Sequence, residues 1–360
     1  MRIAFDATTF ELTKGGTTVY LYNLLKNLKS IDPSNEYLSY GAKLFKQNSS
    51  LQKKINTIYR ETAWRQYSIS RRARNDGINI LHFPNHYSTI YTRIPTVVTF
   101  HDIYILKNSD AFPIGQVMYS KFLIPMVLDK CTKIITVSNF TKNEILHSFE
   151  IPFDKIDVIH NGVGESFEVI KDEELLEMIR RKYNMPQKFI LYVGAIEPRK
   201  NVDKLIDAMQ LVRKEREIDL VIVSHGGWKN EFLLNRIKQN NSFIHFLGFV
   251  EDSDLPLIYN LADLFIYPSS YEGFGLPILE ALACGVQVVA SDIEVFKEII
   301  GTDGIFCNPF EIQKFSEIIL NTLEKTNKDD IITNATTIQK KFSWEKCAMK
   351  TLEFYNSILT

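Results

Sequence analysis

The sequence predicts an α/β protein built from two doubly wound domains with parallel sheets. Short runs rich in β-branched and aromatic residues alternate with helical patterns from end to end. Most of these runs are nearly continuous in apolar residues instead of alternating with polar ones, which is typical of parallel strands covered by helices on both faces. The length of 360 residues is the third observation, because it allows each of two domains to bury a core of its own.

Each half of the chain supplies five candidate strands. In the first half they cover residues 2–5, 78–83, 96–100, 133–137 and 155–159. In the second half they cover residues 189–193, 219–223, 243–246, 264–267 and 287–290. The acidic run 165–177 predicts the junction and the first helix that follows it. We therefore expect an N-terminal domain at 1–165 and a C-terminal domain at 166–343, with a final helix at 344–360 that packs back on the first domain.

Composition places the chain among ordinary globular proteins. Apolar residues make up 45% and charged residues 24% of the sequence. The four cysteines show neither a C-x-x-C pair nor zinc spacing, so we expect reduced thiols in a cytoplasmic protein. Met1 runs directly into the first strand without a signal peptide, and an uncharged apolar window long enough to span a membrane is missing.

The net charge of −1 hides an asymmetry between the two halves. Residues 1–160 carry 20 Lys and Arg against 13 Asp and Glu, whereas the remainder carries 22 against 30. Nine basic residues and one acid lie between Lys43 and Arg74, with Tyr59, Trp64 and Tyr67 among them. This basic stretch is either a helix that lies on an anionic membrane surface or an ordinary solvated helical face.

Candidate binding residues follow the predicted strands, where ligands of open α/β sheets bind. Gly15 and Gly16 come after the first strand, and His101 directly follows strand 96–100. Arg199 and Lys200 follow strand 189–193. These positions predict a binding site at the carboxyl ends of the sheets.

The segment after strand 264–267 carries two carboxylates, Glu272 and Glu280, around a Gly-rich loop that opens a helix. Pro277 suits the first helical turn. The free N–H groups near Gly275 and Leu276 would point at an anion, which the helix dipole also favours. A phosphate between two acceptors of sugar hydroxyls suggests a receptor for a nucleotide-sugar diphosphate.

A D-x-D string at Asp252 and Asp254 could suggest a metal site. It directly precedes a predicted helix at 255–262, so we interpret it as an N-cap. The histidines show no metal-binding spacing either, and we expect activity without a bound metal.

Several ordered strings resemble the retaining GT-B glycosyltransferases of family four. VGAIEPRKN, the long string from FLGFVEDSD to LEALACG, and VVASDI are similar to the sugar-nucleotide domain of that family. TFHD, TVSNFTKNEI and VIHNGV resemble its N-terminal, acceptor-side half. The resemblance covers essentially the whole chain, and it implies two Rossmann-like domains facing across a cleft. Within the family, the strings look most like bacterial enzymes that assemble surface polysaccharides, many of them mannosyltransferases.

The resemblance implies a role for each candidate residue. Arg199 and Lys200 would clamp the diphosphate, on which negative charge gathers as the sugar–phosphate bond breaks. Ala195 stands where the usual family pattern has an arginine, so which cation replaces it stays open. Glu280 would hold the ribose hydroxyls, and Glu272 would lie near the donor sugar.

The remaining candidates would act through the backbone or on the transferred sugar. Phe274, Gly275 and Leu276 would offer backbone contacts, and Gly15 and Gly16 would let the first loop approach the phosphates. His101 matches the active-site histidine of the family and would bind the transferring sugar or steer the acceptor hydroxyl. Retention in this family is attributed to attack on the same face of the sugar, with the leaving phosphate taking the acceptor proton.

We therefore expect an enzyme that moves a hexose, with GDP-mannose as the first candidate donor, to a lipid-linked glycan. It would need no cofactor, bind no nucleic acid and sit peripherally at the inner face of the plasma membrane. A nucleotide-sugar epimerase and a nonenzymatic nucleotide-sugar sensor on the same fold are the alternatives. An oxidoreductase is disfavoured because no G-x-G-x-x-G string follows a strand.

Overall fold

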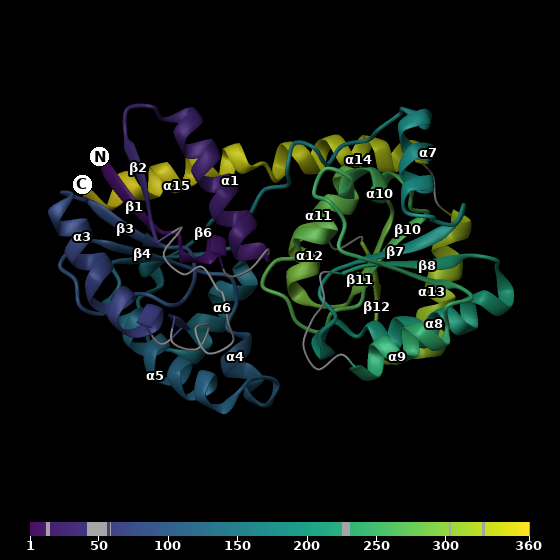
Figure 1. Ribbon diagram of the computed structural model, residues 1–360, viewed down its shortest axis with the longest axis horizontal. Coiled ribbons are helices and arrows are strands. Elements are labelled where there is room, and N and C mark those ends of the chain that lie inside the picture. The colour runs from purple at the N-terminus through teal and green to yellow at the C-terminus, as the bar shows by residue number, and fades with distance from the viewer. Residues whose placement is uncertain are drawn as a thin grey trace. The chain divides into compact units, whose positions relative to one another are not determined.

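The structure is a computed structural model that describes residues 1–11, 15–41, 56–57, 59–224, 231–301, 304–325 and 328–359 (Figure 1). The chain divides into two compact units. Unit 1 comprises Met1–Gly162 and Trp344–Thr360, and unit 2 comprises Val163–Ser343. The junction thus lies a few residues before the boundary expected from the sequence, and the final helix belongs to unit 1.

Unit 1 contains a six-stranded sheet in the order β2-β1-β3-β4-β5-β6, and every neighbouring pair is parallel. Its strands are β1 (Arg2–Asp6), β2 (Glu36–Tyr40), β3 (Ile80–Phe83), β4 (Thr96–Phe100), β5 (Lys133–Thr136) and β6 (Ile156–Val158). The sequence missed β2. This strand lies at the sheet edge and buries only Tyr37 and Tyr40, so it lacks the nearly continuous apolar pattern of the central strands.

Helices cover both faces of this sheet. They are α1 (Gly16–Ile31), a π-helical segment η2 (Arg60–Ser68) that continues into α3 (Ile69–Asn75), α4 (Tyr104–Lys107), α5 (Ile114–Lys130), α6 (Asn139–Ser148) and α15 (Trp344–Leu359). Short 3-10 turns occur at η1 (Thr8–Glu11), η3 (Ser109–Ala111) and η4 (Phe153–Lys155). Helices α1 and α15 pack side by side (Figure 1), whereas α3 and α5 contribute to a shared core cluster with β3 and β4.

A buried polar network ties the C-terminal helix to the sheet. The ring of His82, on β3, contacts the hydroxyl of Tyr355 through Nδ1 at 2.5 Å and that of Thr99 through Nε2 at 2.7 Å. Tyr20 on α1 also reaches Thr99, at 3.0 Å between the two hydroxyl oxygens. Each of these polar groups is buried, so each needs a partner, and the network fixes where α15 docks.

Unit 2 repeats the architecture with the strand order β12-β11-β10-β7-β8-β9, again entirely parallel. Its strands are β7 (Phe189–Val193), β8 (Asp219–Val223), β9 (Ile244–Gly248), β10 (Leu264–Tyr267), β11 (Val288–Ser291) and β12 (Ile305–Cys307). The sequence missed β12, which has three residues and lies at an edge. The prediction of two parallel, doubly wound α/β sheets is confirmed.

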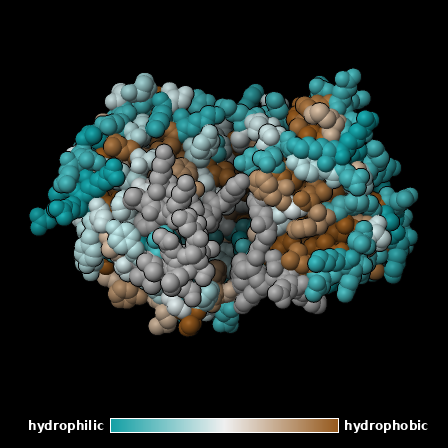
Figure 2. All heavy atoms as spheres, in the orientation of Figure 1, coloured by the Kyte–Doolittle hydropathy of each residue, from teal (hydrophilic) through white to brown (hydrophobic). Residues whose placement is uncertain are grey.

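The helices of unit 2 alternate with its strands. They are α7 (Glu173–Lys182), α8 (Val202–Glu215), α9 (Glu231–Gln239), α10 (Leu255–Leu261), α11 (Leu276–Ala283), α12 (Glu294–Ile300), α13 (Ile312–Lys325) and α14 (Lys328–Lys341), and one 3-10 turn, η5, covers Pro198–Lys200. Hydrophilic side chains cover much of the visible surface of both units (Figure 2). Strands β7 and β10 are fully buried and adjacent, so the loops that follow them leave the sheet side by side.

Candidate active site

The candidate residues of unit 2 gather where the strand order of its sheet reverses. From β7 the chain winds outward to β8 and β9, and from β10 it winds the other way to β11 and β12. Such a reversal leaves a crevice at the carboxyl ends of the two central strands, which is the usual ligand site of open α/β sheets. The turn η5 follows β7, and the loop that carries Glu272 follows β10.

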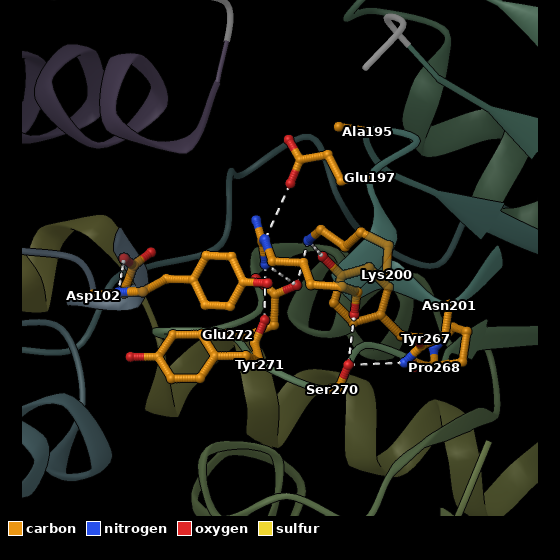
Figure 3. A network of polar contacts seen from close by, with 12 residues as sticks. Asp102, Ala195, Glu197, Lys200, Asn201, Tyr267, Pro268, Ser270, Tyr271 and Glu272 are labelled. Carbon is orange, nitrogen blue, oxygen red and sulfur yellow. Dashed lines mark hydrogen bonds and ion pairs between the residues drawn. The ribbon is translucent and has the colours of Figure 1, made fainter. Parts of the chain in front are cut away.

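Glu272 lies between the two cations of η5. Its Oε1 is 2.9 Å from Nη1 of Arg199, and the same oxygen forms an ion pair with Nζ of Lys200 (Figure 3). All three side chains are largely buried. Arg199, Lys200 and Glu272, which the sequence identifies separately, thus form one charged cluster across the β7 and β10 loops.

Neighbouring groups hold this charged cluster in place. Nε of Arg199 donates to Glu197 at 3.0 Å, and its Nη1 donates to the carbonyl of Tyr271 at 2.8 Å. Nζ of Lys200 donates to the hydroxyl of Tyr267 at 2.6 Å. Because each cation is bound on more than one side, the charges are held in fixed positions before any ligand arrives.

Asn201 joins the two loops. Its backbone is left-handed, with φ 50°, and its side-chain amide donates to the carbonyl of Pro268 at 2.8 Å and to the hydroxyl of Ser270 at 3.0 Å. The backbone N–H of Ser270 in turn donates to the carbonyl of Arg199 at 2.8 Å. Asparagine is one of the few residues that adopt this conformation readily, so Asn201 both turns the chain and locks the two loops together.

The cluster strongly favours an ionised Glu272. Burial alone would raise the pKa of this carboxyl, but Arg199 and Lys200 outweigh burial and lower the pKa to about 2. Burial lowers the pKa of Lys200, and the Glu272 carboxylate opposes that shift. A diphosphate entering here would add negative charge next to two cations that already share a carboxylate.

The loop reaches α11 through Gly275, which has φ 116°. A Cβ at this position would lie 3.0 Å from Cε1 of Phe296, so both the backbone and the available space require glycine. Phe274 is buried against Phe342, with 6.1 Å between the ring centroids, and can therefore offer a ligand only its backbone. Leu276 begins α11, and Pro277 occupies its first turn as the sequence predicts.

Glu280 lies on α11, one turn after the helix begins. The hydroxyl of Tyr259, on α10, donates to its Oε2 at 2.9 Å. Burial raises the pKa of Glu280 to about 7, the hydrogen bond from Tyr259 opposes this, and the charge of Asp252 adds to it. This second carboxylate therefore differs electrostatically from Glu272, since it gains a proton near neutral pH.

His101 is the candidate of unit 1, directly after β4. Its Nε2 lies 2.9 Å from the carbonyl oxygen of Pro84, which can only accept, so Nε2 carries the proton. Burial lowers the pKa of His101, so the ring is neutral and Nδ1 is an acceptor. Tyr20 packs edge-on against the ring, with 5.1 Å between centroids, and Thr141 donates to the carbonyl of His101 at 3.2 Å.

The other glycine candidates lie at the start of α1. Gly15 is the N-cap, and its carbonyl accepts the backbone N–H groups of Thr18 and Val19 at 2.9 and 3.2 Å. Gly16 is the first helical residue. Residues 12–14, which precede them, lie outside the described part of the chain. Gly15 has φ −85°, so its value to a ligand would be the small size of glycine rather than an unusual backbone.

The prediction that the side chain of Asp254 caps the following helix is wrong, although the residue stands at the N-cap position. Asp254 occupies the position before α10, but its side chain makes no capping bond. Its Oδ2 instead pairs with Nζ of Lys182 at 2.5 Å and accepts from the hydroxyl of Tyr183 at 2.7 Å, both at the end of α7. The sequence could not reveal this competing partner, since Lys182 lies 72 positions away. Among the described residues, no group of His, Cys, Asp or Glu side chains is arranged to hold a metal ion.

The basic stretch 43–74 is only partly described, because residues 42–55 and 58 lie outside the described ranges. Within the described part, Trp64 and Arg65 are buried, and Nε of Arg65 forms an ion pair with Asp6 at 2.8 Å. These two residues therefore belong to the interior of unit 1, whereas Arg71 and Arg74 are exposed.

Sequence reasoning missed the residues that support the site. Tyr259 binds Glu280, Tyr267 binds Lys200, and Asn201 joins the two loops. The two tyrosines stand in apolar stretches of sequence that predict only packing. For Asn201, its place directly before a helix was the available signal. The carbonyl oxygen of Ala195 accepts a hydrogen bond from the hydroxyl of Tyr192 at 3.0 Å. Arg199 and Lys200, the two cations of η5, follow Ala195 by four and five residues.

Among the described residues, no helix is both long and apolar enough to cross a membrane.

A family model described as "Glycosyltransferase Family 4" matches residues 14–167, and one described as "Glycosyl transferases group 1" matches residues 177–338. Together they account for both units.

The chain is 35% identical over 281 residues to the O-antigen chain mannosyltransferase B of Escherichia coli, covering 77% of this chain and 74% of the relative. The sucrose-phosphate synthase of Thermosynechococcus elongatus superposes with a TM-score of 0.77 at 18% identity, over 99% of this chain and 98% of the other. Anabaena HepE in complex with UDP-glucose superposes with a TM-score of 0.74 at 18% identity, over 99% and 100%. The chain therefore belongs to the family-four glycosyltransferases and is a glycosyltransferase with the GT-B fold.

Proposed function

We propose that this enzyme transfers mannose, with retention of configuration, from a nucleotide diphosphate sugar to a lipid-linked glycan during the assembly of a cell-surface polysaccharide. The name of the O-antigen chain mannosyltransferase at 35% identity supports mannose as the sugar and a polysaccharide chain as the acceptor. GDP-mannose is the first candidate donor. The UDP-glucose found in a neighbour of the same fold supports a nucleotide-sugar donor in general.

The observation that carries the proposal is the cluster of Arg199, Lys200 and Glu272 at the reversal of the unit 2 sheet. Cleavage of a sugar–phosphate bond leaves negative charge on the departing diphosphate and positive charge on the sugar carbon. Fixed cations stabilise the first, and a carboxylate held ionised stabilises the second. The cluster holds two cations and one carboxylate, so it can stabilise both the departing diphosphate and the positively charged sugar carbon.

Other residues would bind the rest of the donor. Glu280 would accept hydrogen bonds from the ribose hydroxyls, while the backbone of Phe274, Gly275 and Leu276 and the start of α11 would contact sugar and diphosphate. In unit 1, Gly15 and Gly16 would leave room for phosphate oxygens. The neutral His101 would accept a hydroxyl of the transferring sugar or of the acceptor through Nδ1.

The step requires no nucleophile from the protein. The acceptor hydroxyl would attack from the face that the diphosphate leaves, and a diphosphate oxygen would take its proton, which gives a retained anomeric configuration. Since Arg199 and Lys200 supply the cationic charge, we propose turnover without a metal ion or other cofactor. Loss of activity in a chelator with recovery in manganese would contradict this.

A lipid-linked acceptor would place the enzyme at the cytoplasmic face of the plasma membrane. The excess of basic residues in the first 160 positions supports contact with anionic lipids. A nucleotide-sugar sensor on the same fold would bind the donor but transfer nothing, so product formation separates the two.

The first experiment is thermal-shift binding of GDP-mannose, GDP-fucose, UDP-glucose, UDP-galactose, UDP-N-acetylglucosamine and NAD. A ligand of the native state raises the melting temperature in proportion to RT ln(1 + [L]/Kd). We expect GDP-mannose to raise it in the wild type and in the surface variant Glu317→Ala, and to raise it far less in Glu280→Ala. A shift with a UDP-sugar alone would overturn the choice of donor, and NMR of the glycan product would test retention.

A further inference from the structure

Helix α5 of unit 1 presents apolar side chains to solvent. Ile114, Met118 and Phe122 follow one another at intervals of four residues and are 76%, 61% and 66% exposed. The opposite side of the same helix is buried in the core of unit 1 through Val117 and Ile124. Residues four apart lie above one another on a helix, so the three exposed side chains form one stripe, which we call the α5 stripe.

Helix α5 itself carries little charge beside the α5 stripe. Lys121 is the single charged residue between Ile114 and Leu128, and it is exposed. The acid at the far end, Asp129, forms an ion pair with Lys130 at 3.0 Å. In Figure 2, brown and tan atoms lie along the lower edge of unit 1, where Figure 1 places α5. Large exposed apolar side chains in succession, without acids between them, mark an interaction surface rather than a solvated helix.

A second group of residues on the same side of the unit 1 sheet combines aromatic rings with cations. Tyr67 and Tyr91 are 62% and 57% exposed and stack with 5.6 Å between centroids. Exposed arginines accompany them on α3 and beside Tyr91, namely Arg71, Arg74 and Arg93. We call this group the arginine–tyrosine patch.

Tyr87 links α5 to η2, the element that carries Tyr67 of the arginine–tyrosine patch. Its hydroxyl lies 3.0 Å from Oγ of Ser120 on α5, and the guanidinium of Arg65, on η2, lies 5.5 Å from its ring centroid. Helices α3 and α5 also share one core cluster, to which Ile69 and Ile124 both belong. The apolar stripe and the cationic patch therefore belong to neighbouring elements that pack together against the same strands.

We propose that α5 is a membrane-docking helix, with the α5 stripe inserted into the boundary between headgroups and acyl chains of an anionic lipid surface. The arginines of the neighbouring patch would bind lipid phosphates, and its tyrosines would lie at headgroup level. This inference builds on the membrane contact proposed above. The main membrane contact would then be the apolar helix α5 and not the basic stretch 43–74, whose Trp64 is buried.

The charge pattern favours lipid over a second copy of the chain. In a two-fold symmetric contact through this face, a second copy would offer the arginines of the patch only the same set of apolar side chains, tyrosines and arginines. An anionic lipid surface offers those cations phosphates and offers the α5 stripe an apolar phase. A single partner, the lipid surface, can therefore bind both the arginine–tyrosine patch and the α5 stripe.

The test is vesicle flotation of the full chain with vesicles of phosphatidylglycerol and phosphatidylcholine or of phosphatidylcholine alone. We expect the wild type to bind the anionic vesicles and the triple variant I114S/M118S/F122S to bind them at least about tenfold more weakly. The matched control M178S/F310S removes exposed apolar side chains from unit 2 and should bind like the wild type. Replacing Arg71, Arg74 and Arg93 by Ser should weaken binding and reduce its dependence on salt.

Equal binding of the wild type and the triple variant, or no binding of the wild type to anionic vesicles, would overturn the proposal. So would a concentration-dependent dimer of the wild type that the triple variant loses while its vesicle binding stays unchanged. Thermal-shift binding of GDP-mannose, measured on the same samples, should be equal in wild type and triple variant. Failure of the donor to bind either protein would count against the proposed function and leave the docking helix standing.

Discussion

Tyr259 donates a hydrogen bond of 2.9 Å to Oε2 of Glu280, so a hydroxyl on α10 binds the carboxyl group on α11 that would receive the donor ribose. Burial raises the pKa of Glu280 to about 7, and Tyr259 holds it below the value that burial would otherwise set. The hydroxyl thereby keeps a fraction of Glu280 ionised near neutral pH. Its effect should be visible in binding and in stability.

We expect donor affinity to rise between pH 6 and pH 8, because only the ionised Glu280 accepts hydrogen bonds with both oxygens. Tyr259→Phe removes a hydrogen bond to a charged group and should raise the pKa of Glu280 further. Donor binding at pH 7 should then weaken by about three- to tenfold, and less at pH 8.5. Calorimetric titration across this range measures it, with Tyr37→Phe in unit 1 as the control. An unchanged pH profile in Tyr259→Phe would contradict the role given to the hydroxyl.

Glu280→Gln should make the folded protein more stable at pH 8. In the folded state the pKa of Glu280 is raised from 4.5 to about 7, so the folded protein keeps a proton that the unfolded chain releases. Stability therefore falls as pH rises through this window, by roughly 3 kcal/mol in total. The variant lacks this penalty, and urea unfolding should show its advantage at pH 8 and little difference near pH 4. An advantage of equal size at both pH values would show that the charge of Glu280 is not its cause.

Glu272→Gln should have the opposite effect. Two buried cations lower the pKa of Glu272 from 4.5 to about 2, so its contribution to stability is complete above pH 4.5 and is lost as pH falls toward 2. Removing the carboxylate leaves Arg199 and Lys200 facing each other without it, which should cost about 3–5 kcal/mol at pH 7. Replacing Lys200 by Met in the same chain should recover part of this loss. A cost below about 1 kcal/mol at pH 7 is incompatible with a buried ion pair.

His101→Ala should lower turnover more than donor affinity if Nδ1 binds the transferring sugar or the acceptor. His101→Asn is the informative companion, because its amide oxygen can replace a neutral acceptor and should restore part of the activity. Burial lowers the pKa of His101 below its ordinary value of 6.5, so this residue should add no step to turnover between pH 7 and pH 8. Steady-state kinetics and donor binding of both variants test this. Equal losses of donor affinity alone would show that His101 acts on the donor and not on the reaction.

Tyr355→Phe should destabilise unit 1 by about 1–3 kcal/mol, since it leaves Nδ1 of the buried His82 without its partner. Burial lowers the pKa of His82 to about 3, so protonation cannot compensate near neutral pH. Tyr22→Phe, at an exposed tyrosine of α1, is the control for the loss of a tyrosine hydroxyl and should leave stability unchanged. Thermal unfolding of both variants compares them, and equal stability of Tyr355→Phe and the wild type would show that the network does not anchor α15.

The central strands could be predicted because most of their positions are apolar and buried, and β4, β7, β8 and β10 begin and end where the sequence places them. The missed strands β2 and β12 are edge strands with one partner and less burial, so the apolar pattern that marks a strand is weakest there. The loop between Glu272 and Glu280 could be identified as well, since glycine, proline and carboxylate each have a local reason for their position.

Local sequence by itself determined the central strands, the alternation of strands and helices that gives two parallel sheets, and the candidate residues at the strand ends, because burial pattern and turn chemistry act over a few neighbouring positions. Tertiary structure alone decided the partners. It brought Lys200 to Glu272 across 72 positions, aimed Asp254 at Lys182 instead of its own helix, and set the pKa values of Glu272 and Glu280 far apart. Ion pairs and desolvation depend on distances between segments remote in sequence, and packing sets those distances.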